Sequence, residues 1–198
     1  MDILTREFYS RDTLTVARDL LGRDIVRVLE DGTELVCRIT ETEAYIGRLD
    51  KACHAYGGKR TPRTETLFAP PGTAYIYLIY GMYHCLNFVT EEEGEPAAVL
   101  IRGAVPVTNG DIIAENRFAC KEKDMTAYQR KNFLNGPGKL CRGLLLTRAQ
   151  NGLDLTGPAG GLYLLPGAPP DPAAVRTGKR IGIDYAEEAV HFPWRFYL

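Results

Sequence analysis

The chain has 198 residues, which suffices for one domain with a sizeable core and argues weakly against two. Apolar residues make up 45% and charged residues 25%, as in ordinary globular proteins, and no segment has the roughly 20 apolar residues of a membrane span. The N-terminal segment MDILTREFYS lacks the hydrophobic core of a signal peptide, so we expect a cytosolic protein without a membrane partner.

Net charge and cysteine spacing limit the kinds of site. The formal net charge of -1 argues mildly against a nucleic-acid partner, although residues 126–150 carry five basic side chains and no acidic one. The five cysteines are widely spaced and form no C-x-x-C pair, which argues against structural zinc. We therefore expect buried free thiols and no bound metal.

The first part of the chain predicts a helix followed by two strands. Ser10 can cap a helix that ends at Gly22. Residues 24–29 and 34–46 have strand patterns, with a turn at Asp31-Gly32 between them. One face of the second strand begins apolar and becomes acidic, which brings carboxylates into a partly buried setting; its residues are Leu35, Cys37, Ile39, Glu41, Glu43 and Tyr45.

A tyrosine-rich segment follows a long loop. Residues 47–72 are rich in glycine and proline and predict an ordered loop of functional character. Residues 73–87, TAYIYLIYGMYHCLN, predict two strands joined by a bend. Alternation places Tyr75 and Tyr77 on one face, where we interpret Tyr75 as a packing residue. The bend forms a candidate apolar wedge suited to stacking on a base, made of Tyr80, Gly81, Met82 and Tyr83.

The remaining elements are a strand, three helices and short strands near the C-terminus. Residues 97–105 form an apolar strand interrupted by Arg102, which needs a carboxylate, a phosphate or water nearby. The last predicted helix begins beside Lys139, either as a phosphate contact or as an ordinary loop-to-helix junction. The predicted helices span 112–119, 127–134 and 139–146, and the predicted strands span 162–165, 180–185 and 195–198.

The chemistry-bearing residues can be combined into one site. A carboxylate in a partly apolar cleft can hold a water and remove its proton during attack on an electron-poor carbon. Arg102 could orient that carboxylate and keep it ionised, because a nearby positive charge lowers a carboxyl pKa. Each group also has an ordinary structural alternative: solvent-facing Glu41 and Glu43, an ion-paired Arg102, a loop histidine at His54 and a backbone-bonded Asn87.

Several long segments match a known family in the correct order: ETEAY at 41–45, GGKRTPR at 57–63, PGTAYIYLIYGMYHCLN at 71–87, VLIR at 99–102 and GPGKLCRGL at 136–144. They resemble the 3-methyladenine DNA glycosylase family of the alkyladenine type. The resemblance implies one α+β catalytic domain over residues 1–198, with a mostly antiparallel curved sheet and helices packed around it. It also implies a monomer without metal or cofactor that acts on double-stranded DNA at the nucleoid.

Carried over residue by residue, the resemblance assigns roles in base excision. Glu43 would be the general base that activates water for attack on the sugar C1′ carbon, and Arg102 would help to hold that water. Asn87 would oppose the exocyclic amino group of normal guanine. The other implied contacts are Tyr45, His54 and Tyr77 around the flipped base, and Tyr80, Gly81, Met82, Tyr83, Arg63 and Lys139 along the DNA.

The implied reaction is the release of an alkylated or deaminated purine, with 3-methyladenine, 7-methylguanine, hypoxanthine and etheno-adenine as candidates. No lysine lies among the pocket candidates, so we expect hydrolysis without strand cleavage through a Schiff base. Two alternatives remain open at this point. One is an RNA-binding module without chemistry, and the other is a glycosidase that acts on nucleosides or sugars through Glu41 and Glu43.

Overall fold

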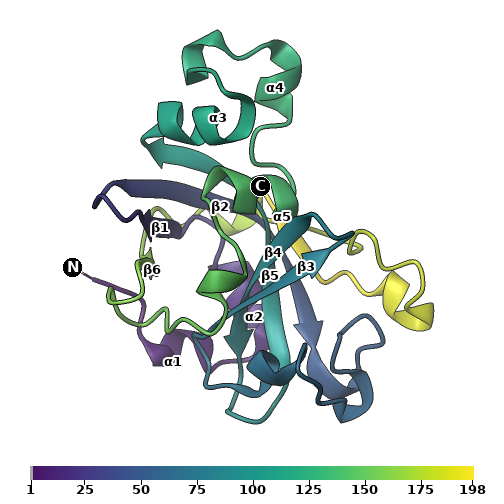
Figure 1. Ribbon diagram of the computed structural model, residues 1–198. Coiled ribbons are helices and arrows are strands. Elements are labelled where there is room, and N and C mark those ends of the chain that lie inside the picture. The colour runs from purple at the N-terminus through teal and green to yellow at the C-terminus, as the bar shows by residue number, and fades with distance from the viewer. Residues whose placement is uncertain (1) are drawn as a thin grey trace.

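The strands form one curled antiparallel sheet, seen in a computed structural model that describes residues 2–198 (Figure 1). The sheet has eight strands in the order β3-β4-β5-β2-β1-β6, with β8 paired to β2 and β7 to β8. The predicted α+β class with a curved antiparallel sheet is confirmed. The strands are β1 (Asp24–Val28), β2 (Glu34–Ile46), β3 (Ala74–Ile79), β4 (Tyr83–Thr90), β5 (Ala97–Thr108), β6 (Leu162–Leu165), β7 (Arg176–Gly178) and β8 (Arg195–Tyr197).

The long central strand β2 gives the sheet its curl. Its first half pairs with β1, its second half pairs with β8, and β5 runs along most of its length. Irregularities in the β2–β5 register flank Glu41, and such bulges bend a strand and re-aim its side chains. The bend lies next to Glu43, which pairs with Leu100 of β5.

Five α-helices accompany the sheet within residues 2–198: α1 (Arg6–Tyr9), α2 (Thr13–Asp19), α3 (Gly110–Phe118), α4 (Ala127–Lys131) and α5 (Pro137–Gly143). The helix expected between Ser10 and Gly22 is two helices, because Ser10 ends α1 and the Asp12 carboxylate caps α2 by accepting from the Thr15 N–H. α5 begins earlier than expected because Pro137 suits the first helical turn. α3 and α4 project from the body at the end of β5 (Figure 1).

One predicted strand is wrong. Residues 180–185 belong to no strand or helix, and the neighbouring strand β7 ends at Gly178. Gly182 has a left-handed backbone with φ of 76°, which breaks an extended run. The segment runs instead along a cavity beside β2 and β3.

The apolar interior has a large cluster and a smaller one near this cavity. The large cluster joins the inward face of the sheet to α2, α3 and α5. The smaller one includes Phe68 and Tyr75, with Tyr45 and Tyr77 packed against it. The five cysteines have free thiols, and no helix within residues 2–198 is long and apolar enough to cross a membrane.

Candidate active site

A cavity of about 520 Å³ opens between the β3–β4 hairpin, the loop before it and the C-terminal segment. This volume lies within the range of about 300–1,000 Å³ that is usual for small-molecule sites. The structure brings many of the predicted site residues together here. The predicted residues that line the cavity are Tyr45, His54, Arg63, Tyr77, Tyr80, Asn87 and Arg102.

Glu43 lies directly behind the cavity wall, with no exposed surface of its own. The Tyr45 hydroxyl donates to its Oε2 at 2.8 Å, and the Ile181 backbone N–H donates to its Oε1 at 2.7 Å. The Arg102 Nε lies 3.4 Å from the same Oε1. All three partners line the cavity, so the carboxylate is fixed at the boundary between the protein interior and the pocket.

Burial sets the basicity of Glu43. Desolvation raises its pKa above the usual range, and this effect outweighs Arg102, the Ile181 N–H and the Tyr45 hydroxyl, which all lower it. As expected, Arg102 lowers the pKa of Glu43. Its effect is smaller than that of burial, so the pKa of the carboxyl is raised overall. A carboxylate with a raised pKa is a better proton acceptor.

Arg102 is shared between two carboxylates. Besides Glu43, its Nε donates to Glu41 Oε1 at 3.2 Å, and Arg195 donates to the same oxygen at 3.1 Å. Glu41 is therefore held between two arginines, whereas the oxygens of Glu43 are held by an arginine, a hydroxyl and an amide. Glu41 thus fits the ion-paired structural role, and Glu43 has the environment of a base.

One wall of the cavity consists of aromatic side chains that pack against one another. His54 Nδ1 lies 3.1 Å from the Tyr75 hydroxyl, and its ring meets the Tyr77 ring edge to face at 4.6 Å. Burial, with Arg63 nearby, lowers the pKa of His54 to about 4, so the imidazole is neutral at neutral pH. Tyr75 packs as predicted and also lines the cavity, because alternation places it beside Tyr77.

Asn87 lies in the same wall, and its amide nitrogen donates to backbone oxygens. Nδ2 donates to the backbone oxygens of Tyr75 at 3.1 Å and Cys85 at 3.3 Å. The backbone-bonded alternative is therefore correct for the amide nitrogen. These bonds also fix the orientation of the side chain on β4.

The tip of the β3–β4 hairpin stands out into solvent. Tyr80 is 85% exposed and has a left-handed backbone with φ of 51°, which is uncommon for a bulky residue. Gly81 and Met82 complete the turn, Tyr83 begins β4, and the Met82 N–H donates to the Ile79 carbonyl at 3.1 Å. The exposed aromatic tip matches the geometry expected of a wedge.

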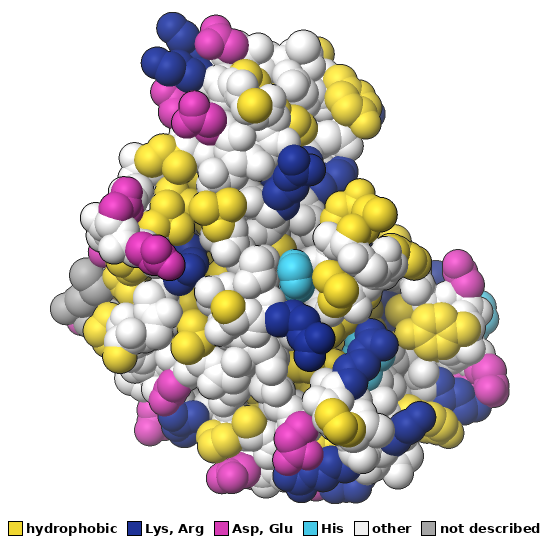
Figure 2. Space-filling view, viewed as in Figure 1, with side chains coloured by type: hydrophobic (Ala, Val, Ile, Leu, Met, Phe, Trp, Pro, Cys, Tyr) yellow, Lys and Arg dark blue, Asp and Glu magenta, His cyan; other side chains and the backbone are white. Residues whose placement is uncertain are grey.

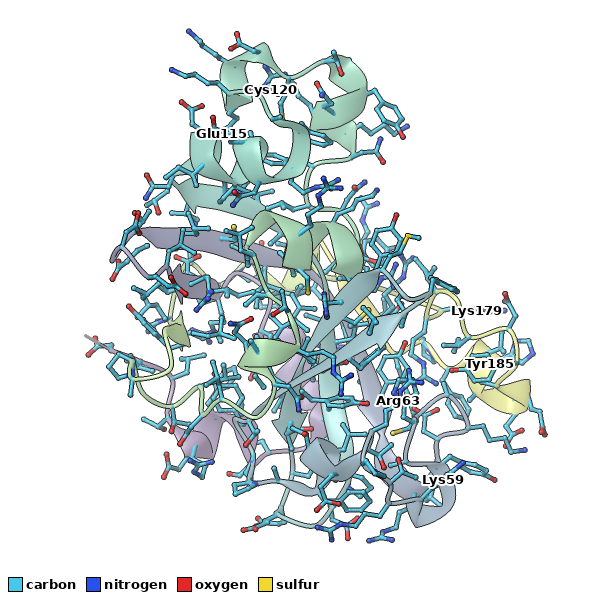
Figure 3. All side chains as sticks on the ribbon, viewed as in Figure 1. Lys59, Arg63, Glu115, Cys120, Lys179 and Tyr185 are labelled. Atoms are coloured by element: carbon cyan, nitrogen blue, oxygen red, sulfur yellow. The ribbon has the colours of Figure 1, made fainter. Side chains whose placement is uncertain are left out.

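Lys139 and Arg63 differ in how available they are. The Lys139 ammonium donates to Asn132 Oδ1 at 2.8 Å and Asn135 Oδ1 at 3.0 Å, and it does not line the cavity. Arg63 is exposed, with its guanidinium 5.5 Å from the centre of the Tyr77 ring. Figure 3 shows Arg63 and Tyr185 on the same side of the molecule, where both line the cavity.

Sequence reasoning missed the C-terminal part of the site. Ile181, Gly182, Ile183 and Tyr185 line the cavity, and the Ile181 N–H binds Glu43. The glycine between two isoleucines was the only local signal against a strand, and the alternation of apolar residues masked it.

Charge on the molecular surface is uneven. On the face seen in Figure 2, Lys and Arg side chains gather over the middle of the molecule, while Asp and Glu lie mainly toward its edges. A net charge of -1 therefore coexists with a locally basic face.

Comparison with known proteins identifies the family of the chain. The methylpurine-DNA glycosylase (MPG) family matches the chain over residues 7–198. The chain belongs to this family. A relative from Desulfitobacterium hafniense strain Y51 is 50% identical over 198 residues, covering 100% of the chain and 96% of the relative. A relative from Clostridium perfringens strain SM101 is 50% identical over 196 residues, covering 98% and 95%. Both relatives are provisionally named 3-methyladenine DNA glycosylases.

Membership of the methylpurine-DNA glycosylase family confirms the resemblance and the predicted enzyme class. The protein is a DNA glycosylase of base excision repair, a hydrolase of N-glycosyl bonds whose substrate is damaged DNA.

Proposed function

We propose that the protein excises alkylated and deaminated purines from double-stranded DNA with a water activated by Glu43, and leaves an abasic site. The observation that carries this proposal is a fully buried carboxylate fixed at the edge of an aromatic cavity. We further propose that residues 1–198 act as one catalytic domain in a monomer.

The proposed chemistry is a single displacement at the sugar. As the bond from C1′ to the purine nitrogen breaks, its electron pair leaves with the base, and the water oxygen bonds to C1′ while its proton passes to Glu43. The carboxylate also stabilises the positive charge that develops on the sugar. Alkylation at a ring nitrogen makes the base a cationic leaving group, so little acid catalysis is needed. Arg102, 3.4 Å from Glu43, would orient the carboxylate and the water.

The aromatic wall suits a flat base that carries positive charge. Rings of Tyr45 and Tyr77 can attract a cation through their faces. A neutral His54 avoids the repulsion that an imidazolium would impose on such a base. These features support 3-methyladenine and 7-methylguanine as substrates, and the hydrogen-bonding groups of the wall support hypoxanthine and etheno-adenine.

The exposed hairpin tip would supply the wedge. Extrusion of a nucleotide costs a few kcal/mol, and least where the base is damaged. Tyr80, which is 85% exposed, would fill the gap in the duplex, with Met82 and Tyr83 beside it. Arg63 at the cavity mouth would contact the phosphate backbone, as would Lys139 if DNA displaces its asparagine partners.

Strand cleavage is not part of the proposed reaction. A Schiff base at the abasic sugar needs an amine nucleophile. No lysine lines the cavity among residues 2–198. The product should therefore be an intact strand with an abasic site.

A single-turnover assay tests the proposal. A duplex with one hypoxanthine, labelled on the damaged strand, is incubated with protein in excess and then treated with alkali, which breaks abasic sites. Glu43→Gln should slow excision by about 10²–10⁴-fold, the usual contribution of a general base. Binding to a duplex with an abasic analogue should be retained.

A matched control and three outcomes make the assay decisive. Glu65→Gln alters an exposed carboxylate paired with Arg60 and should excise at the wild-type rate. Wild-type activity in Glu43→Gln would contradict the role of Glu43. Strand breaks before alkali would contradict a purely hydrolytic reaction, and equal rates on the free nucleoside would contradict a need for duplex DNA.

A further inference from the structure

We propose that Arg180 is a positioning residue for Glu43, acting through a buried clamp with Asp50 that fixes two of the groups that hold the carboxylate. The inference rests on the proposed role of Glu43 as base. Neither Arg180 nor Asp50 lines the cavity or touches the carboxylate.

The clamp itself is a two-point ion pair with no exposed side-chain surface. Arg180 Nη1 lies 2.5 Å from Asp50 Oδ2, and Nη2 lies 2.8 Å from Oδ1. Asp50 also accepts the backbone N–H groups of Ile46 and Ala52 at 3.1 Å and 3.0 Å. Arg180 Nη1 donates to the Ala44 carbonyl at 2.8 Å. The C-terminal segment is thereby tied to the end of β2, the strand that carries Glu43.

The first link from the clamp to the carboxylate runs through Tyr45. The Arg180 guanidinium lies 4.7 Å from the centre of the Tyr45 ring and 4.9 Å from that of Trp194. A guanidinium this close to an aromatic face attracts the ring and restricts its orientation. The hydroxyl of the same ring donates to Glu43 Oε2 at 2.8 Å.

The second link runs along the backbone. Ile181 follows Arg180 directly, and its N–H donates to Glu43 Oε1 at 2.7 Å. Residues 179–183 lie outside every strand and helix, so no ladder of backbone bonds fixes this amide. The side chain of Arg180 is the anchor immediately before it. Both oxygens of Glu43 are therefore bound by groups whose positions depend on one buried guanidinium.

A buried ion pair often adds little to the stability of a protein. The cost of removing both charges from water can exceed their attraction, and apolar residues of similar volume often serve as well. What the planar fork of Arg180 offers is fixed geometry. A misplacement of about 1 Å near reacting groups can cost about 10²-fold in rate.

The test compares Arg180→Lys with the double variant Asp50→Asn/Arg180→Gln. Lysine keeps the charge but loses the two-point geometry. The double variant removes both charges, so it leaves no unpaired charge in the interior. If Arg180→Lys does not fold, the positioning role is tested with the double variant. Arg38→Lys is the control for loss of two-point pairing. Arg38 binds both oxygens of Asp24, at 2.8 and 2.9 Å, in a partly exposed pair that does not line the cavity.

Three readouts separate positioning from general destabilisation: single-turnover excision, affinity for a duplex with an abasic analogue, and the pH dependence of excision. Both Arg180 variants should excise about 10²-fold more slowly with unchanged DNA affinity. The acidic midpoint of the rate should rise, because loss of the Ile181 N–H removes a group that favours ionised Glu43. Displacement of the Tyr45 hydroxyl acts in the same direction, while the other groups acting on this charge stay in place: Arg102, Glu41 and Cys85.

The outcomes distinguish this inference from the proposed function. If Glu43→Gln excises at the wild-type rate, the role of Glu43 fails. If Glu43→Gln is slow while a folded Arg180 variant excises like wild type, only the positioning role fails. An equal loss of rate in Arg38→Lys would also overturn it, since general destabilisation would then account for both.

Discussion

The surroundings of Glu43 on β2 and of the tip of the β3–β4 hairpin are opposite in character. Glu43 is fully buried, with both oxygens bound by protein groups. Tyr80 is 85% exposed on a turn with a left-handed backbone. The difference fits the roles proposed for Glu43 and Tyr80. A proton acceptor needs a fixed position and a tuned pKa, whereas a residue that enters DNA must be free of partners until the duplex arrives.

The two regions also lower the stability of the folded state for different physical reasons. At the carboxylate the cost is desolvation, which raises the pKa of Glu43. At the hairpin tip the cost is backbone strain, of order 1–3 kcal/mol for a residue in a sparsely populated conformation. Changes at the first region should therefore affect the rate of excision, and changes at the second should affect DNA binding.

After Glu43→Gln, the largest expected effect is at Arg102. Arg102→Gln should slow single-turnover excision by about 10²–10³-fold, the size seen when one group aimed at a reacting centre is removed. Affinity for damaged duplex should stay near that of wild type. Arg195→Gln is the control, because Arg195 pairs with Glu41 at 3.1 Å but does not line the cavity. Equal losses in both variants would show that the arginines act only as a structural network.

The pH dependence of excision tests the tuning of Glu43. Because burial raises its pKa above the usual 4.5, the carboxylate should be more than half protonated before the pH falls to 4.5. Excision should then fall about tenfold for each pH unit below the raised pKa. Single-turnover rates between pH 4.5 and 8 measure this limb. A flat profile over that range would contradict a base with a raised pKa.

The hairpin tip should give a binding effect. Tyr80→Ser removes a ring whose stacking is worth about 1–3 kcal/mol, so affinity for damaged duplex should fall about 5–150-fold. Thermal stability should be unchanged, since the ring is exposed. Tyr128→Ser is the matched control, because Tyr128 is 74% exposed on α4. Unchanged binding and excision in Tyr80→Ser would refute the wedge role.

The sequence predicted the strands that follow local rules. The bounds of β2 and β6 match the predicted 34–46 and 162–165, because alternating side chains and flanking turn residues mark both ends. Strand alternation also placed Glu41 and Glu43 on one face. It could not separate them, since their difference lies in partners from β5, β8 and the C-terminal segment.

The errors arose where distant contacts override local pattern. Residues 180–185 have the composition of a strand, but the buried pairing of Arg180 with Asp50 and the left-handed Gly182 hold them as a loop. The Asp50 partner lies 130 residues from Arg180, so no local window contains it. Lys139 differs, because the asparagines that bind its ammonium lie only four and seven residues away, and its phosphate contact stays a prediction.

Glu43→Gln should also have a smaller effect on thermal stability, and this effect should be a gain where the effect on the excision rate is a loss. The pKa of Glu43 is raised in the folded state, so its contribution to stability is fully present below the unfolded value of 4.5 and is lost as pH rises through the folded pKa. Glu43→Gln should therefore raise the melting temperature at pH 7, and this gain should vanish near pH 4. Thermal melts across this range measure it. A less stable variant at pH 7 would contradict the desolvation cost.

The smallest expected effect concerns His54 in the cavity wall. Burial and Arg63 lower its pKa to about 4, so the imidazole should be neutral over most of the range in which excision is measured. Its ring resonances, followed by NMR and assigned with a His54→Gln variant, should shift only near pH 4. The rate limb assigned to Glu43 should then be unchanged in His54→Gln, although binding of the base is weaker. A His54 resonance that titrates near pH 6.5 would mean that the wall carries a charge during catalysis, and the argument for a neutral surface facing a cationic base would fail.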